Sequence, residues 1–283
     1  MAKRGQPSKK PQARDRLPNA PLVEVVFELR WALWGSPGIP APFRSDPGVL
    51  PLLHAFTTAA EQLGFVTKLD MSRVEETGAY GVIRRYKKGE ALNFPLLQIG
   101  VGIFAANEGP TYQWTQYKAL VLSGVKAVLE SYPNLPSFPL QPSYLELRYV
   151  DMFDDVLLNT AELTEFLSRG TTARMSAPPF LMDGELFEGP TDARVVLGRR
   201  VKEWKATNFL VDCATGLREG QRGIRLETKV VTQQPGVPIL RASGQFLDET
   251  ERWLDFAHGF TSPFFREFVT PDLMDQFRVS NRG

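Results

Sequence analysis

Hydrophobic and polar positions alternate along residues 23–31, where Phe27, Leu29 and Trp31 share one face and mainly polar residues take the other. A period of two is typical of a strand with one buried face. Over residues 50–63 the apolar positions follow a helical spacing instead, which predicts an amphipathic helix. The same patterns predict further strands at 79–87 and 94–105 and a helix over 112–132.

A proline-rich segment at 136–142 interrupts these patterns and is predicted to be a linker. Beyond it we expect a strand at 144–150 and a helix at about 160–169. A long helix is predicted to start after Asp248, and Pro263 is expected to kink it or end it. The other predicted elements are strands near 193–204, 207–213, 223–232 and 238–247 and a short helix near 272–277.

Two short segments of the chain match each other. Residues 27–31 read Phe-Glu-Leu-Arg-Trp, and residues 145–149 read Leu-Glu-Leu-Arg-Tyr. Each segment opens a series of strand, helix, several strands and helix, which predicts an internal duplication with halves at 17–135 and 143–283 packed as one body. Such units often build one continuous antiparallel sheet with the helices on one face, so the expected fold class is α+β.

Four segments carry a resemblance to a known family: LPNAPLVEVVFELRW, LLQIGVGIFAANEGPTYQWTQY, LELRYVDMF and DFAHGFTSPFFREFVTPDLM. Over most of residues 17–270 the chain resembles a family of uncharacterised bacterial proteins, described as sporadically distributed and of unknown function. The basic tail and residues 177–192 lie outside the matching segments. The resemblance implies no catalytic residue, ligand or activity. A sporadic distribution would suit genes of mobile or defence loci.

The composition is that of an ordinary globular protein, with 43% hydrophobic and 23% charged residues. No apolar run is long enough for a membrane helix, and no apolar segment follows the basic N-terminus as a secretory signal would require. The single cysteine, Cys213, excludes an intramolecular disulfide and fits a reducing cytoplasm. Residues 1–16 carry six Lys and Arg against Asp15, a net charge of +5 that leaves −4 for the rest, and they are predicted to form a disordered tail.

Aromatic residues are concentrated towards the C-terminus, on more than one face of the predicted long helix. They include Trp253, Phe256, Phe260, Phe264 and Phe265. Such side chains pack against a sheet or form a contact surface, because interfaces are enriched in aromatic residues. The preferred hypothesis is a non-enzymatic binding protein that uses this helix to engage a protein partner or its own copy, as in a homodimer.

Two predicted basic strands suggest an alternative, a nucleic-acid-binding module that also uses the basic tail. The residues are Arg84, Arg85, Lys87 and Lys88 in the first half and Arg199 and Arg200 in the second. Basic strands can follow a nucleic-acid backbone, with neighbouring tyrosines stacking on bases. Charged strands also face solvent and protect a sheet edge from aggregation, which is the simpler interpretation.

A second alternative, a metal-dependent hydrolase, rests on Asp151, Asp154 and Asp155 at the end of the strand at 144–150. Carboxylates there would suit Mg²⁺, which prefers oxygen ligands. A polar exit from the strand is the simpler explanation. By alternation Asp151 falls on the apolar face of its strand, so its carboxyl group must be paired or lie near an edge.

Only two histidines are present, His54 and His258. His54 lies beside the apolar stripe of its predicted helix. His258 follows Asp255 by three residues on a predicted helix, so these two side chains can meet. No nucleophile signature accompanies either histidine, and no phosphate-binding or zinc motif is found. The sequence therefore predicts no catalytic residue and no cofactor.

Overall fold

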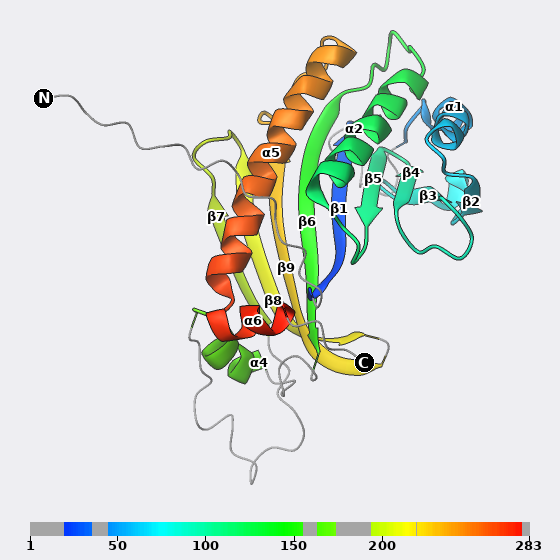
Figure 1. The fold of residues 1–283 in the computed structure, drawn as a ribbon. Coiled ribbons are helices and arrows are strands. Elements are labelled where there is room, and N and C mark those ends of the chain that lie inside the picture. Colours follow the sequence, from blue (N-terminus) through cyan, green and yellow to red (C-terminus); the bar gives the residue numbers. More distant parts are fainter. Residues whose placement is uncertain (1–19, 36–44, 155–162, 174–193, 219, 279–283) are drawn as a thin grey trace, which may run out of the picture.

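The structure is a computed structural model that describes residues 20–35, 45–154, 163–173, 194–218 and 220–278. Within these ranges nine strands form one antiparallel sheet in the order β2-β3-β4-β5-β1-β6-β9-β8-β7 (Figure 1). The α+β class is therefore confirmed. The strands are β1 (Leu22–Trp31), β2 (Thr67–Asp70), β3 (Val82–Lys87), β4 (Leu96–Gly100), β5 (Ile103–Glu108), β6 (Pro142–Asp154), β7 (Arg194–Arg200), β8 (Thr207–Arg218) and β9 (Gln221–Gln233). The helices are α1 (Val49–Gln62), η2 (Val74–Glu76), α2 (Trp114–Ser131), α4 (Leu163–Glu165), η3 (Phe166–Gly170), α5 (Ser243–Phe268) and α6 (Pro271–Arg278).

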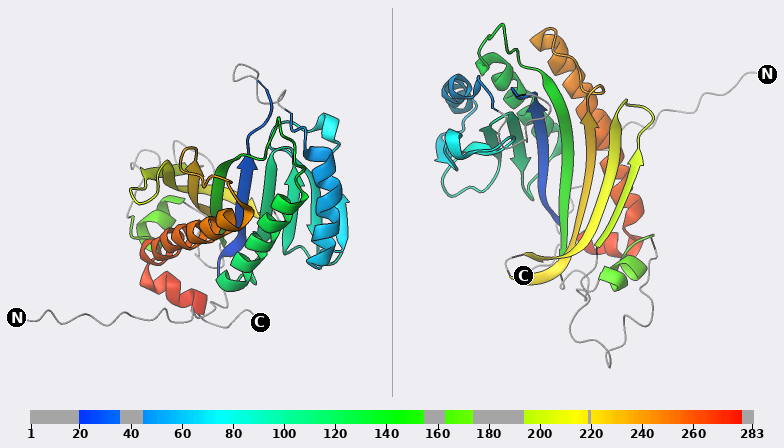
Figure 2. Two further views of the ribbon diagram at one scale, coloured as in Figure 1. Left: turned by 90° about the horizontal axis from the view of Figure 1, so that it is seen from above. Right: turned by 180° about the vertical axis from the view of Figure 1, so that it is seen from behind.

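The strands β1 and β6 lie side by side in the middle of the sheet (Figure 2). Their register pairs Phe27 with Leu147 and Glu28 with Glu146. On the outer sides, β5 pairs with β1 and β9 pairs with β6. The two matching five-residue segments of the sequence are thus antiparallel neighbours in space.

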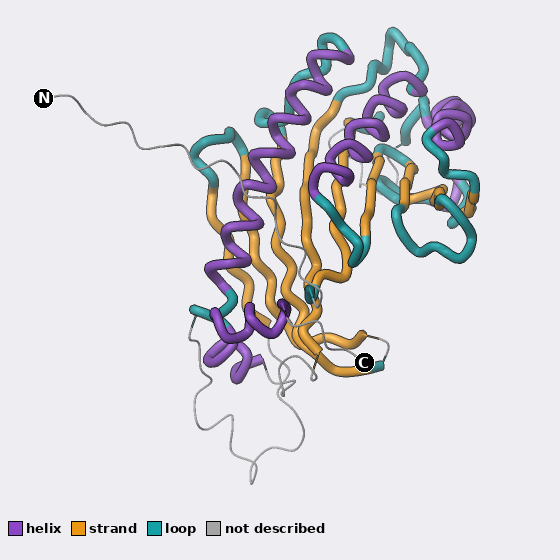
Figure 3. Tube along the Cα trace, in the orientation of Figure 1, coloured by secondary structure: helices purple, strands orange, loops and turns teal. Residues whose placement is uncertain are grey.

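Alternation along β1 buries Phe27 and Leu29 on the face that packs against helices. The helices α2 and α5 run side by side across this face (Figure 3). The ring centroid of Phe27 lies 6.5 Å from that of Phe104 on β5 and 6.1 Å from that of Trp253 on α5. Trp253 Nε1 also donates a hydrogen bond to Thr232 Oγ1 at 2.8 Å, which fixes α5 to β9. Each buried ring contributes roughly 1.5–3 kcal/mol to the core.

A second apolar cluster lies where α4, η3 and α6 meet the far end of β6. The ring of Phe153 on β6 packs against Phe166 at 4.8 Å and Phe277 at 6.0 Å between centroids. The short helix expected near the C-terminus is therefore present as α6 and packs onto the sheet. None of the described helices is long and apolar enough to cross a membrane.

Residues 94–105, predicted as one strand, instead contain β4, a tight turn and the start of β5. Gly100 pairs with Ile103 across this hairpin. Gly102 has a φ of +72°, a conformation that glycine adopts without the clash a side chain would cause. A Cβ atom at Gly102 would also approach the Leu33 side chain to 2.5 Å. The glycines therefore mark a reversal of the chain rather than an interruption within one strand.

The helix α5 begins at Ser243, so the strand predicted at 238–247 is wrong. Phe246 and Trp253 are fully buried at helical spacing along α5. Their packing in the core overrides the local β preference of this segment. Pro263 lies inside α5, and the helix continues beyond it instead of ending there.

The carboxylate of Asp46 connects three parts of the first half of the chain. It accepts hydrogen bonds from Trp31 Nε1 and Tyr132 Oη at 2.8 Å each, and from the backbone amide of Gly48 at 2.9 Å. Asp46 is buried, so these three donors replace the water that the carboxylate loses. A Cβ atom at Gly48 would lie 2.6 Å from the Tyr132 ring, which explains the glycine.

We expect Asp46→Ala to lower the free energy of unfolding by about 3 kcal/mol, because it leaves three buried donors without an acceptor. Asp46→Asn keeps the Oδ1 acceptor for Tyr132 and Gly48 and should cost less, because only the bond from Trp31 is lost. Urea denaturation at neutral pH measures both values. Equal losses in the two variants would contradict this assignment.

Candidate functional site

The face of the sheet opposite Phe27 and Leu147 carries charged and polar side chains on every strand from β3 across to β7. The alternation that buries odd-numbered residues of β1 and β6 directs their even-numbered residues to this face. We call this surface the charged face. Its residues are Glu24, Glu28 and Arg30 of β1, Tyr144, Glu146 and Arg148 of β6, Arg225, Glu227 and Lys229 of β9, Asp212 of β8, Arg194 of β7, Arg85 of β3, Gln98 of β4 and Asn107 of β5.

Glu28 and Glu146 face each other at the centre of the charged face. Only 8% of Glu28 and 5% of Glu146 is exposed. Like charges directly opposite each other on neighbouring strands normally destabilise a sheet. Burial raises the pKa of Glu28, the charge of Arg30 opposes that rise, and the charge of Glu146 adds to it.

Each of these glutamates lies beside the arginine two residues farther along its own strand. Arg30 Nε donates a hydrogen bond to Glu28 Oε1. Arg148 Nε lies 3.4 Å from Glu146 Oε1. The repeated Glu-Leu-Arg sequence therefore places an arginine beside a glutamate on both central strands, with a hydrogen bond at Arg30 and an ion pair without one at Arg148 Nε.

Two tyrosine rings restrict the guanidinium group of Arg30. Its Cζ atom lies 4.5 Å from the ring centroid of Tyr144 and 5.0 Å from that of Tyr80. Tyr144 Oη donates in turn to Glu146, and burial together with this carboxylate raises the pKa of Tyr144. Tyr80 has a φ of +61°, which is uncommon for a residue with a bulky side chain. Arg30 is thus held in a defined position at the sheet surface.

A second pair of carboxylates, Asp212 and Glu227, is also directly opposed across β8 and β9. Arg194 donates to both oxygens of Asp212, at 2.8 and 2.5 Å. Arg225 lies 3.8 Å from Asp212, and Lys229 Nζ lies 2.9 Å from Glu227 Oε1. The hydrogen bond from Arg194 lowers the pKa of Asp212. Cations therefore surround this pair, as they do the central one.

A chain of hydrogen bonds extends the charged face over β3, β4 and β5. Arg85 donates to Gln98 Oε1 at 3.0 Å from Nη2 and at 3.2 Å from Nε. Gln98 Nε2 donates to Asn107 Oδ1 at 2.8 Å, and Asn107 Nδ2 donates to Glu24 Oε1 at 2.6 Å. These bonds fix the side chains in one arrangement across four strands.

On the helix side of the sheet, a tyrosine–histidine cluster joins β6 to α2 and α5. Tyr149 Oη lies 2.8 Å from both Tyr112 Oη and His258 Nδ1. The imidazole of His258 stacks on the indole of Trp114, with ring centroids 4.0 Å apart and planes inclined by 12°. The buried imidazole of His258 is therefore held in place by stacking on Trp114 and by the hydroxyl group of Tyr149.

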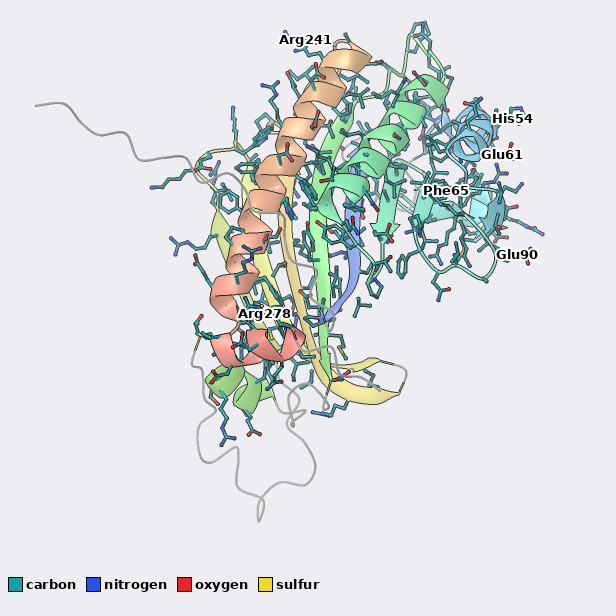
Figure 4. The ribbon with its side chains drawn as sticks, viewed as in Figure 1. His54, Glu61, Phe65, Glu90, Arg241 and Arg278 are labelled. Atoms are coloured by element: carbon teal, nitrogen blue, oxygen red, sulfur yellow. The ribbon has the colours of Figure 1, made fainter. Side chains whose placement is uncertain are left out.

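Asp255 contacts Trp114 and Lys118 rather than forming the expected pair with His258. Its Oδ1 accepts from Trp114 Nε1 at 3.3 Å, and Lys118 Nζ lies 3.0 Å from its Oδ2. Asp255 therefore supports the indole on which His258 stacks. The other histidine, His54, is exposed on α1 (Figure 4).

The structure directs two of the three candidate metal ligands, Asp151 and Asp154, to opposite faces of the sheet. Asp151 is buried on the side of Tyr149 and Phe153, whereas strand alternation directs Asp154 to the charged face. Asp155 lies outside the described residues. No group of three or more His, Cys, Asp or Glu side chains suited to a metal ion occurs in the described part of the chain.

Burial raises the pKa of Asp151 to about 7. Within the described residues its carboxyl group has no hydrogen-bond or ion-pair partner, so desolvation acts alone. The alternation of β6 therefore directs this carboxyl group to the helix side of the sheet, away from Asp154.

The candidate nucleic-acid residues lie near opposite ends of the sheet, because β3 is next to one edge and β7 forms the other. Arg84 donates to Asp70 on the neighbouring strand β2 at 2.7 Å and to the carbonyl oxygen of Leu53 on α1 at 3.1 Å. The other basic residues near β3 also have partners: Arg85 bonds to Gln98, Lys87 bonds to the carbonyl oxygen of Glu90, and Lys88 lies over the ring of Phe65. On β7, Arg199 and Arg200 are exposed. The two basic strands do not form one continuous basic patch.

The aromatic residues of α5 pack within the chain. Trp253 has no exposed surface, so it belongs to the core rather than to a contact surface. The other four candidates are partly exposed, and each contacts another aromatic ring. Phe256 contacts Trp204, Phe260 and Phe264 both contact Phe209, and Phe265 contacts Phe153. These contacts match the alternative in which the aromatic residues pack against the sheet.

Comparisons with family models, with curated proteins and with solved structures find no match to this chain. The charged face is the part of the site that sequence reasoning missed. Its signal was present as the repeated Glu-Leu-Arg at 28–30 and 146–148. The repeat by itself indicates a duplication, and only the register of β1 with β6 brings its two glutamates opposite each other.

Asp151 should make stability depend on pH. A folded-state pKa of about 7, above the ordinary value of 3.8, means that the folded state favours the protonated form. The contribution of Asp151 to stability is then most favourable below pH 4, falls by an amount on the order of 4 kcal/mol as the pH rises towards 7, and is constant above it. Asp151→Asn should remove this loss and be the more stable protein at pH 8. Urea denaturation of both proteins at pH 5 and pH 8 provides the test, and parallel pH dependence would refute the assignment.

The central pair gives a second stability prediction. Arg30→Met leaves Glu28 beside Glu146 without its cation and should destabilise the fold by about 3 kcal/mol. Combining it with Glu28→Gln should restore most of that loss, because the buried charge is gone. Chemical denaturation at pH 7 measures the cycle. A double variant whose loss is the sum of the two single losses would show that Arg30 and Glu28 are not coupled.

Proposed function

We propose that this chain is a non-enzymatic binding protein that engages a protein partner, or its own copy, through the charged face. The observation that carries the proposal is the pairing of Glu28 with Glu146 and of Asp212 with Glu227 on neighbouring strands. The proposal includes a duplication with the helices of both halves on one face of the sheet. It is supported by the adjacent, antiparallel placement of the two Glu-Leu-Arg segments.

Stability alone does not account for the charged face. Opposed carboxylates cost free energy, and a buried ion pair is often no more stabilising than apolar residues of the same volume. An ordinary solvent-facing strand would place its charges at exposed positions. Here the carboxylates are buried, and the arginines above them keep part of their surface open, with 32% of the Arg30 side chain and 31% of the Arg148 side chain exposed. Fixed, partly open guanidinium groups suit recognition, because little side-chain entropy remains to be lost on binding.

The mixture of charges favours a protein partner over nucleic acid. Nucleic-acid-binding surfaces carry an excess of Lys and Arg over a face or stripe. On the charged face, by contrast, acidic groups alternate with basic ones across β1, β6, β8 and β9. Such a surface is complementary to a protein surface with its own pattern of both signs.

This interface replaces the aromatic face of α5 as the proposed contact, because the rings of α5 pack within the chain. The cytoplasmic location, the relationship to a bacterial family of unknown function and the origin in a mobile or defence locus remain part of the proposal. They rest on the sequence segments that carry the resemblance and on the single Cys213.

Site-specific photo-crosslinking tests the proposal. A benzophenone side chain would replace Val150, which lies partly exposed among the charges of β6 and keeps every charged residue intact. The control position is Arg252 on α5, with 71% of its side chain exposed. We expect a discrete adduct from position 150 and none from position 252. Its mass identifies a second copy when the purified protein is irradiated, or a partner when cells are irradiated.

Adding Arg148→Glu to the position-150 protein should abolish the adduct, because it reverses the charge of the arginine beside Glu146. Circular dichroism and thermal unfolding establish that this variant is folded. The proposal fails if position 150 gives no adduct under either condition, or if positions 150 and 252 give the same adducts.

A further inference from the structure

The strand β7 forms one edge of the sheet and pairs, within the described residues, only with β8. It has seven residues, whereas β2 at the other edge has four. An edge strand presents a row of backbone donors and acceptors that another strand can pair with. Proteins limit such pairing with short edges, and β2 follows that rule while β7 does not.

The middle of β7 is apolar and exposed. Val196 is 58% exposed on the charged face, and Leu197 is 50% exposed on the other. Arg199 and Arg200 follow after Gly198, one on each face. Within the described part of the chain these two arginines have no ion-pair or hydrogen-bond partner, whereas Arg194 is bound to Asp212.

The charges of β7 decide what can pair with it. A second copy of β7, added antiparallel about a two-fold axis at Leu197, would place Arg194 opposite Arg200. Like charges directly opposite each other are destabilising, so self-pairing in this register, which would pair all seven residues of β7, is disfavoured. The chain's own tail at 1–16 is basic and is disfavoured for the same reason.

We propose that β7 binds an extended acidic segment of a protein partner, which adds a tenth strand to the sheet. Backbone hydrogen bonds along the edge would supply affinity, and side chains opposite β7 would supply specificity. The partner strand carries two adjacent acidic residues opposite Arg199 and Arg200. One residue opposite Gly198 separates them from two apolar residues opposite Val196 and Leu197.

This inference rests on the protein-partner form of the proposed function but uses the backbone edge of β7 rather than the paired charges at the centre of the charged face. The outcome of crosslinking at Val150 on β6 does not decide it, and loss of strand addition at β7 leaves the charged face untouched. The two proposals therefore fail separately.

The test uses the full chain and two blocked heptapeptides of opposite direction, Ser-Glu-Glu-Thr-Val-Val-Thr and Thr-Val-Val-Thr-Glu-Glu-Ser. Titration is followed by two-dimensional NMR of the protein amides. We expect one direction to bind and to shift the amides of β7 and β8. Two further versions of that peptide are N-methylated, one at its odd-numbered and the other at its even-numbered backbone nitrogens. The version whose methyl groups point towards β7 loses the hydrogen bonds to the edge and should not bind. The version whose methyl groups point away from β7 should bind.

Arg199→Glu combined with Arg200→Glu should weaken the peptide about tenfold or more. The matched control, Arg252→Glu on α5, should change affinity by less than about twofold. The proposal is overturned if neither peptide binds, in which case the arginines only protect the edge. It is equally overturned if both N-methylated phases bind as well as the parent, because binding would then be electrostatic without strand pairing.

Discussion

The antiparallel pairing of β1 with β6 is the constraint on which the rest of this structure depends. It joins strands from the two parts of the chain in the middle of the nine-stranded sheet. Because side chains alternate along a strand, one register places Phe27 and Leu147 in the core and leaves Glu28 beside Glu146 on the other face. A shift of one residue would bury charged groups against the helices at a cost of several kcal/mol, so the register is strongly specified.

The long helix α5 packs across the central strands and holds them together. Trp253 of α5 packs on Phe27 of β1 and donates a hydrogen bond to Thr232 of β9, so one side chain of the helix contacts two strands. Toward its C-terminal end, Phe265 contacts Phe153 on β6. The aromatic residues of α5 thus contact other rings of the chain, and four of them keep part of their surface exposed.

The protein buries carboxylates in three different environments. Asp46 is satisfied by three hydrogen-bond donors. Glu28 and Asp212 lie opposite other carboxylates and are compensated by arginines. Asp151 has neither kind of compensation within the described residues, and its pKa rises to about 7. The first environment stabilises the fold, the second places fixed charges at a surface, and the third makes stability depend on pH.

The sequence by itself determined the local features: the α+β class, the strand at β1, the helices near α1 and α2, and which residues share a face of each strand. Alternation and helical spacing are properties of neighbouring residues, so they are visible along the chain. Only the tertiary structure decided that Glu28 meets Glu146, that the basic strands β3 and β7 lie far apart in the strand order, and that Trp253 is buried. These facts depend on which distant strands pair and in what register, and long-range packing sets that choice. For the same reason packing overrode the local β preference of residues 238–247, and a turn at Gly102 divided a predicted strand in two.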